Sequence, residues 1–192
     1  MNTYIRPAAM LLLLMTLLTG AVYPAVITLI AQSLFPYQAN GSLIRDSNNQ
    51  PIGSELISQY FSSPGYFWSR PSATGPYAYN AAASSGSNLG PTNPALTEAV
   101  ANRIQMLKTA YPDNQAPIPI DLVTTSASGL DPHISIAAAH YQLKRVAKAR
   151  KISETQLQGF LQTHIEDRQW GIFGEPRINV LKLNIALDKL AQ

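Results

Sequence analysis

The chain has 192 residues, no cysteine and a formal net charge of +3 at pH 7. The lack of cysteine excludes disulfide bonds, thiolate metal sites and cysteine nucleophiles, and the small net charge gives no indication of a nucleic-acid partner. Charged residues make up 13% of the chain, roughly half the usual share, which is compatible with extensive burial of the soluble part against partner proteins.

An uncharged segment near the amino terminus, residues 8–35, predicts a membrane-spanning helix. At 1.5 Å per residue it would be about 42 Å long, which exceeds the ~30 Å hydrocarbon core and allows a tilt. A cleaved secretory signal is the alternative, because Arg6 precedes the apolar run, but that run is too long for a signal peptide. Pro24 lies inside the segment, which hints at neighbouring helices that satisfy the carbonyl it frees.

The span divides the chain into a tail (residues 1–7), the transmembrane helix (8–35) and one soluble domain (36–192). The soluble part has the ordinary size of a domain with a single core. The α-amino group and Arg6 lie on the amino side of the span, whereas Arg45 is the one basic residue close to its carboxyl end. Because positive charge favours the cytoplasmic side, we expect a cytoplasmic amino terminus and a domain outside.

The first part of the soluble domain is rich in turn-forming residues. Residues 42–57 predict a short strand, a polar turn at 48–51, and then either a second strand or the start of a helix. Residues 62–94 are rich in Ser, Gly, Pro, Asn and Tyr and predict one long loop. A loop of this length is unusual in a compact domain, so we expect it to be functional or held against a partner.

Capping patterns predict four helices in the remainder. The patterns are Asn93 before Pro94, Asp131 before Pro132, Ser153 with Gln156 three residues on, and Asn179. The first helix should end before Pro112, the second should run to about Lys151, and the third should include Ile165 on its apolar face. Residues 118–124 predict a short buried strand. The sequence therefore predicts an α+β domain with about four helices, a small sheet and one long ordered loop.

No pattern indicates an active site or a metal site. Asp131 and His133 could form an acid–base pair, but an N-cap role for Asp131 and an exposed place for His133 in the first helical turn are favoured. The three histidines lack the spacing of a zinc site, and neither a nucleophile elbow nor a Walker loop is present. Two Gly-rich fragments, SSGSNLG (residues 84–90) and SASGL (residues 126–130), could offer main-chain N–H groups to a phosphate. The second directly precedes the predicted second helix, which makes it the better candidate for anion contact.

The cationic residues fall into two groups. Lys144, Arg145, Lys148, Arg150 and Lys151 cluster at the end of the predicted second helix, where a solvated face is favoured over a docking patch for acidic lipid or protein.

Arg70 and Arg177 are isolated in apolar or Gly/Pro contexts and are predicted to make structural or partner contacts. The candidate counter-ions are Glu175 and Asp121.

Several long motifs together resemble one family. They are FWSRPSATGPYAYNAAASSGSNLGPTNPAL, VTTSASGLDPHIS, QLKRVAKARK and GEPRINVLKLNIALD, which follow a short amino-terminal span. In order and spacing the chain resembles KdpC, the C subunit of the bacterial high-affinity potassium-transporting Kdp ATPase. The resemblance implies a non-catalytic accessory subunit in the bacterial inner membrane, with a potassium-selective channel-like subunit and a P-type ATPase subunit as partners. No DKTGT-like phosphorylation site is present, in agreement with that role.

The resemblance also implies a catalytic chaperone that raises the ATP affinity of the hydrolysing subunit. No cofactor is expected to bind tightly, and ATP is expected only in a transient complex with that subunit. By this resemblance the nucleotide-binding residues would be Ser126, Ser128, Gly129 and Gln142, and the partner contacts would be Arg70, Ser87, Asn88 and Arg177. ATP is cytoplasmic, however, whereas the flanking charges place the domain outside. The alternative is a structural cap on the outer face of the potassium-selective subunit, without nucleotide contact.

Overall fold

The computed structural model describes residues 2–190. The contacts between residues separate the chain into two compact units, Met1–Leu43 and Ile44–Gln192.

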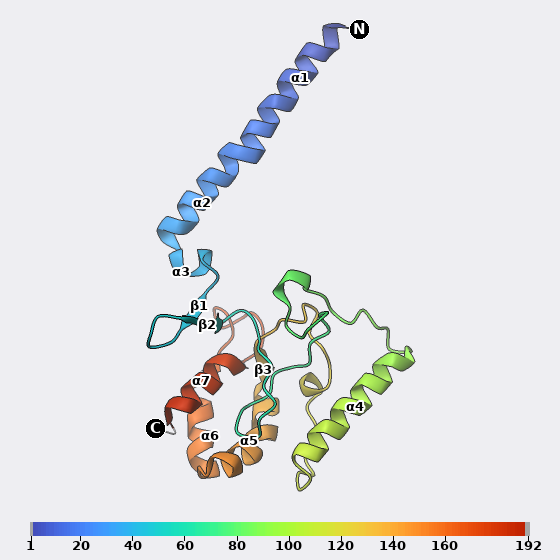
Figure 1. Cartoon of the computed structure of the whole chain (residues 1–192), viewed down its shortest axis with the longest axis vertical. Coiled ribbons are helices and arrows are strands. Elements are labelled where there is room, and N and C mark those ends of the chain that lie inside the picture. The colour runs from blue at the N-terminus through green and yellow to red at the C-terminus, as the bar shows by residue number, and fades with distance from the viewer. Residues whose placement is uncertain (1, 191–192) are drawn as a thin grey trace. The chain divides into compact units, whose positions relative to one another are not determined.

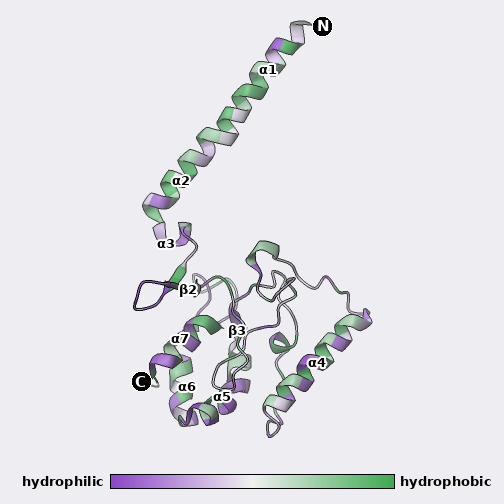
Figure 2. Cartoon of the chain, viewed as in Figure 1, coloured by the Kyte–Doolittle hydropathy of each residue, from purple (hydrophilic) through white to green (hydrophobic). Residues whose placement is uncertain are grey.

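The first unit is a long helix followed by one short turn of helix (Figure 1). The long helix comprises α1 (Asn2–Leu17), a π-helical segment η1 (Leu18–Val22) and α2 (Tyr23–Leu34), and the short helix is α3 (Pro36–Ala39). Apolar residues cover most of it (Figure 2), and within residues 2–190 one helix, Thr3–Leu34, is long and apolar enough to cross a membrane. The predicted long apolar helix is confirmed, and it begins within the segment expected to be a tail.

The π-helical segment ends two residues before Pro24. The Tyr23 N–H donates to the carbonyl of Leu18, five residues back, and the Thr19 hydroxyl donates to the carbonyl of Met15 at 2.7 Å. Proline has no N–H to donate. The wider turn therefore accommodates it within a continuous helix.

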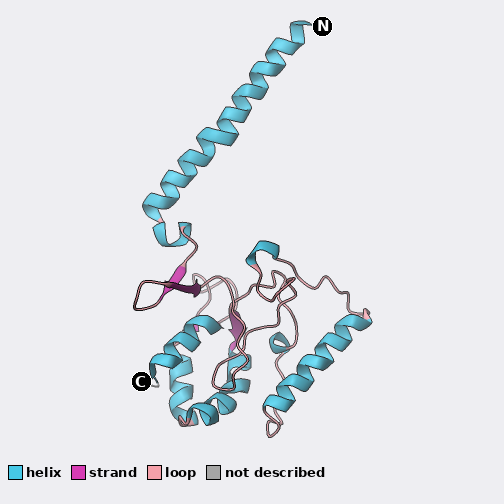
Figure 3. Cartoon of the chain, in the orientation of Figure 1, coloured by secondary structure: helices cyan, strands magenta, loops and turns pink. Residues whose placement is uncertain are grey.

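The second unit combines helices with two small antiparallel sheets (Figure 3). Its helices are α4 (Pro94–Ala110), α5 (Ile136–Arg150), α6 (Glu154–Gln162), α7 (Val180–Leu190) and the 3-10 segments η2 (Ala81–Ala83) and η3 (Ile120–Leu122). A hairpin of β1 (Leu43–Arg45) and β2 (Pro51–Ser54) precedes them. The other sheet has the order β3 (His133–Ser135), β5 (Arg177–Asn179), β4 (Ile165–Glu166). The α+β fold, the hairpin and the small sheet are confirmed.

Three of the predicted helix caps are confirmed. The Asn93 side chain accepts from the Ala95 N–H at 3.0 Å, the Ser153 hydroxyl from the Gln156 N–H at 3.2 Å, and the Asn179 side chain from the Lys182 N–H at 3.1 Å. Each side chain satisfies an N–H group that has no partner within its helix.

The strand predicted at residues 118–124 is wrong. The segment forms η3 instead, with the Thr124 N–H donating to the carbonyl of Ile120 at 2.9 Å. Pro117 and Pro119 lack N–H groups, so the segment cannot form a regular strand ladder.

The predicted start of the second helix is also wrong. Asp131 accepts from the main-chain N–H of His133 at 3.0 Å, and His133 begins strand β3, opposite Asn179. The helix starts at Ile136, four residues later than predicted, and is capped by the Ser135 hydroxyl, which accepts from the Ala138 N–H at 3.0 Å. Pairing with β5 is available only in the folded chain, so the local capping pattern was misleading.

Ile165 belongs to a strand rather than to the third helix. Helix α6 ends at Gln162, and Ile165 pairs with Ile178 on the central strand β5. The core lies between this sheet and helices α5, α6 and α7, which lie together in the structure (Figure 1). Its fully buried apolar members include Val146, Leu157, Ile178, Leu183, Leu187 and, from the long loop, Phe67.

Candidate functional site

The long loop of residues 62–94 crosses the core between two helices. The amide of Asn184 on α7 binds both main-chain groups of Phe67, accepting at 2.9 Å and donating at 2.9 Å. The amide of Gln142 on α5 does the same for Trp68, at 2.7 and 3.1 Å. The loop is thus ordered, as expected, and it is held by the chain's own helices.

Two arginines of α5 bind the same stretch of the loop, residues 64–68. Arg145 is buried, lies 4.3 Å from the centre of the Trp68 ring, and donates at 2.7 Å to the carbonyl of Pro64 and to Gln142. Burial lowers the pKa of Arg145 to about 10, so the group remains a cation at neutral pH.

Arg150 stacks 4.6 Å from the centre of the Tyr66 ring and pairs with Asp188 at 2.7 Å. The prediction of one solvated cationic face is therefore wrong for Arg145 and Arg150, although Lys144, Lys148 and Lys151 are exposed. The two arginines are interior because the loop covers them, which helical periodicity does not reveal.

The turn at residues 126–130 packs against a later part of the same loop. The Ser128 carbonyl accepts from the Ser85 N–H and the Ser84 hydroxyl, both at 3.0 Å, and the Gly129 carbonyl accepts from the Ser72 hydroxyl at 2.7 Å. Gly129 has a φ of +68°, and a Cβ there would lie 2.6 Å from the carbonyl oxygen of Ser85. Only glycine fits this close approach.

The expected nucleotide residues do not form one surface group. Ser126 is buried and Ser128 is exposed on the turn, whereas the Gln142 side chain is buried in the core. The turn is followed by β3 and not by a helix, so the expected anion site at a helix N-terminus is not formed. The nucleotide role of Ser126, Ser128, Gly129 and Gln142 stays a prediction.

An open groove brings together two of the predicted partner contacts, Arg70 and Arg177. It has a volume of about 600 Å³ and is lined by residues in or beside the loop, η3, β3, the first turn of α5 and the start of β5. These residues are Arg70, Pro119, Ile120, Asp121, Asp131, His133, Ile134, Ser135, Ala137, Glu175, Pro176 and Arg177. We call it the arginine groove.

The ion pairs of the groove differ from the predicted ones. Arg70 pairs with Asp131 at 3.2 Å and donates to the carbonyl of Thr125 at 3.3 Å. Arg177 lies 3.6 Å from Glu166 through its Nε atom, farther than a hydrogen bond.

Neither predicted counter-ion is used by these arginines. Asp121 accepts from the Ser135 N–H at 2.7 Å and caps the end of β3, and Glu175 pairs with Arg168 at 2.6 Å. The actual partners lie on β4 and before β3, and sheet pairing brings them to the groove.

The charge of Asp131 is stabilised by its neighbours. Burial alone would raise the pKa of Asp131, but hydrogen bonds from His133 and the charge of Arg70 bring this pKa below its ordinary value. His133 itself lies between two carboxylates, with Nδ1 3.1 Å from Asp131 and Nε2 3.4 Å from Glu166. Within residues 2–190 no group of His, Asp and Glu is arranged to hold a metal ion.

Ser87 and Asn88, the other predicted partner contacts, lie on the loop outside the lining of the groove. Asn88 is exposed and has a φ of +53°, which asparagine tolerates better than most residues. Their role stays a prediction.

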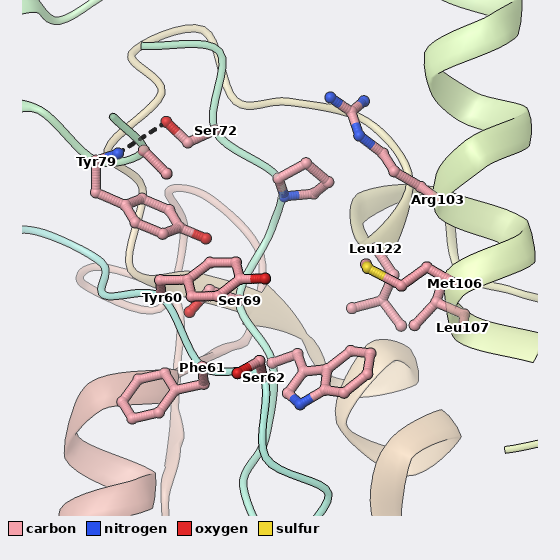
Figure 4. Close-up of a pocket in the computed structure, with 13 residues that line it drawn as sticks. Tyr60, Phe61, Ser62, Ser69, Ser72, Tyr79, Arg103, Met106, Leu107 and Leu122 are labelled. Carbon is pink, nitrogen blue, oxygen red and sulfur yellow. Dashed lines mark hydrogen bonds between the residues drawn. The ribbon is translucent and has the colours of Figure 1, made fainter. Parts of the chain in front are cut away.

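A second, smaller pocket was not predicted from the sequence. It has a volume of about 220 Å³ and lies between the long loop, α4 and η3. Figure 4 shows Tyr60, which precedes the loop, and Tyr79 from the loop on one side, and Arg103, Met106 and Leu107 from α4 on the other. Its residues come from segments far apart in the chain, and only the turn at Ser72, which binds the Tyr79 N–H at 3.0 Å, is a local signal.

Comparisons with known proteins agree with the resemblance. The family model described as "KdpC: K+-transporting ATPase, c chain" matches residues 5–189. A protein of Herpetosiphon aurantiacus is 59% identical over 99% of this chain and 98% of its own length. One from Methylococcus capsulatus is 57% identical over 99% and 100%, and one from Dechloromonas aromatica is 56% identical over 100% of both. All three are named potassium-transporting ATPase KdpC subunit.

Proposed function

Because the chain belongs to the KdpC family of potassium-transporting ATPase subunits, we propose that it is a non-catalytic accessory subunit of the Kdp potassium-uptake complex. Its span packs beside the membrane helices of partner subunits, and its soluble domain docks on the outer face of the potassium-selective subunit through the arginine groove. The groove is the observation that carries the proposal.

The groove has hydrogen-bonding capacity left for a partner. A guanidinium has five N–H donors, and Arg70 uses two of them in hydrogen bonds to Asp131 and the Thr125 carbonyl. The only ion contact of Arg177 in the described residues is the 3.6 Å approach to Glu166. Both side chains are partly exposed. Carboxylates or main-chain carbonyls of a partner are the groups that such forked donors bind well.

Any effect on ATP affinity then acts at a distance. The flanking charges favour a domain outside the membrane, away from cytoplasmic ATP. The amide of Gln142 is engaged with Trp68, and the carbonyls of the turn at 126–130 are engaged with the loop. These contacts favour a coupling free energy transmitted through partner subunits over direct contact with nucleotide.

Co-purification of the Kdp complex tests the groove. The variant Arg177→Gln should reduce the recovery of partner subunits while the melting temperature of the chain changes little, because the ion contact of Arg177 within residues 2–190 is the long approach to Glu166. The matched control is Lys144→Gln, which removes an exposed positive charge on α5 outside the lining of the groove. Equal recovery for wild type and Arg177→Gln would refute docking through this groove.

Two further experiments test on which side of the membrane the domain lies and whether it contacts ATP directly. In spheroplasts, external protease should cleave the domain, and protection of the domain would refute the outside placement. In the assembled complex, a photoreactive ATP analogue should label the hydrolysing subunit and not this chain. Label at Ser126, Ser128 or Gly129 would instead support the transient nucleotide complex.

A further inference from the structure

The segment between β4 and β5 carries a cluster of exposed apolar side chains. Trp170 is 86% exposed, Ile172 71% and Phe173 57%, within four consecutive residues. Single exposed apolar residues are ordinary, but a contiguous group of large ones marks a contact surface. We call residues 169–173 the aromatic tip.

The backbone of the aromatic tip is well defined. The main chains of Gln169 and Phe173 exchange two hydrogen bonds of 2.9 Å, and the Ile172 N–H donates to the Gln169 carbonyl at 3.1 Å. The Trp170 and Phe173 rings meet edge to face with centroids 5.9 Å apart. At its base, Arg168 and Glu175 form an ion pair of 2.6 Å. The three side chains are thus presented by a closed turn and not by a loose loop.

Trp170 is a poor choice for this turn on local grounds. It has a φ of +53° and is followed by Gly171 at +74°, as in the primed hairpin turns that favour Asn-Gly. A bulky residue in this region is unfavourable, and Trp170 gains almost no burial in return. The presence of tryptophan therefore points to a role beyond the turn.

We propose that the aromatic tip inserts into the interfacial layer of the bilayer that holds the span. Tryptophan and phenylalanine beside apolar residues are typical of the membrane–water interface. The same chain supplies the membrane, since Thr3–Leu34 is long and apolar enough to cross it. Nine residues, 35–43, connect α2 to the second unit, and even fully extended they reach only about 32 Å. The tether keeps the tip at a high effective concentration near lipid.

Tryptophan fluorescence provides the test. The chain has two tryptophans, and Trp68 is buried beneath Arg145, so the exposed Trp170 can be isolated by difference. The full chain is reconstituted in phosphatidylcholine–phosphatidylglycerol vesicles, with and without bromine on the acyl chains. The variant Trp170→Asn is the blank, because it suits the turn and removes the fluorophore. The difference signal should be shifted to shorter wavelength in vesicles and quenched by the brominated lipid.

Two exposed aliphatic residues give a matched pair of variants. Ile172→Asp in the tip should abolish the quenching of Trp170, whereas Leu56→Asp, at a residue 58% exposed outside the tip and the groove, should leave it unchanged. Equal emission in plain and brominated vesicles would overturn the proposal. Shielding of Trp170 that arises only when partner subunits are present would also overturn it and assign the tip to a protein surface. The proposed subunit role does not depend on either result.

Discussion

The side chain of Gln142 pairs with the main chain of Trp68 as a neighbouring β-strand would. Its oxygen accepts from the Trp68 N–H at 2.7 Å and its nitrogen donates to the Trp68 carbonyl at 3.1 Å. Asn184 repeats the arrangement for Phe67. Two helical amides therefore satisfy a loop backbone that enters the core without a sheet, where unpaired main-chain groups would be costly.

Replacing Gln142 should destabilise the domain strongly. Gln142→Leu keeps the volume approximately but leaves the N–H and C=O of Trp68 unpaired, together with a donor of Arg145. At about 1–3 kcal/mol for each of these three buried groups, we expect a loss of at least about 3 kcal/mol in the free energy of unfolding. Urea unfolding of the full chain in detergent, followed by near-ultraviolet circular dichroism, measures it.

The control is Gln158→Leu, at an exposed position of α6. Surface substitutions of this kind change the free energy of unfolding by about 0.5 kcal/mol or less. If Gln142→Leu were as mild as Gln158→Leu, the paired hydrogen bonds would not be what holds the loop. A loss of ATP coupling in a Gln142 variant should accordingly track its loss of stability.

Local patterns were sufficient for the helices that start at a cap formed by sequence neighbours. Asn93, Ser153 and Asn179 each bind an N–H two or three residues on, so the signal is contained in a few residues. The helix after Asp131 failed because residues 133–135 pair with β5, more than 40 residues later. Such strands of two or three residues carry too little periodicity to be recognised alone.

The candidate site shows the same difference between features set by local sequence and features set by contacts between distant segments. Arg70 and Arg177 were singled out by their isolated contexts, and the groove does unite them. Their counter-ions could not be chosen from the sequence, because Glu166 reaches Arg177 only through the pairing of β4 with β5. Arg145 was assigned to a solvated face because the loop that buries it is some 80 residues away. Burial by a distant loop leaves no mark in helical periodicity.

A methyl group at position 129 should separate the turn from the loop. Gly129→Ala would place a Cβ 2.6 Å from the Ser85 carbonyl oxygen, at a φ of +68°. Relieving this clash requires a shift of the main chain, which costs free energy, and the positive φ remains unfavourable for alanine. We expect a loss of at least about 1–3 kcal/mol and faster proteolysis of residues 72–86.

Gly159→Ala is the opposite case. No atom lies within 4 Å of a Cβ at that position of α6, so the change should stabilise the helix by about 0.5–1 kcal/mol. If both variants shifted stability in the same direction, contact with Ser85 would not be the reason glycine is needed at 129.

Arg145 should not be replaceable by lysine. The guanidinium donates to the Pro64 carbonyl and to Gln142 while it stacks on Trp68, and an ammonium cannot make this planar set of contacts. Arg145→Lys should lower the free energy of unfolding by about 1–3 kcal/mol. Lys144→Arg, at the exposed neighbouring position, should have almost no effect. A similar melting temperature for the two variants would count against the fastening role of Arg145.

Asp131 should make stability depend on acid pH. Its pKa in the folded domain lies below the ordinary value, because hydrogen bonds from His133 and the charge of Arg70 outweigh the effect of burial. A carboxyl group with a depressed folded pKa adds stability above its unfolded pKa of about 3.9. This stability is lost as the pH falls through the lower, folded pKa.

The variant Asp131→Asn removes this dependence. At neutral pH it should be less stable than wild type by about 1–2 kcal/mol, because charged hydrogen bonds to His133 and Arg70 are lost. The difference should shrink as melting temperatures are measured from about pH 5 down to about pH 2, because wild-type Asp131 becomes neutral as well. Asp113→Asn, at an exposed residue after α4, corrects for general effects of removing a carboxylate. A gap between wild type and Asp131→Asn that stays constant with pH would show that the pairing with Arg70 and His133 does not depend on the charge of Asp131.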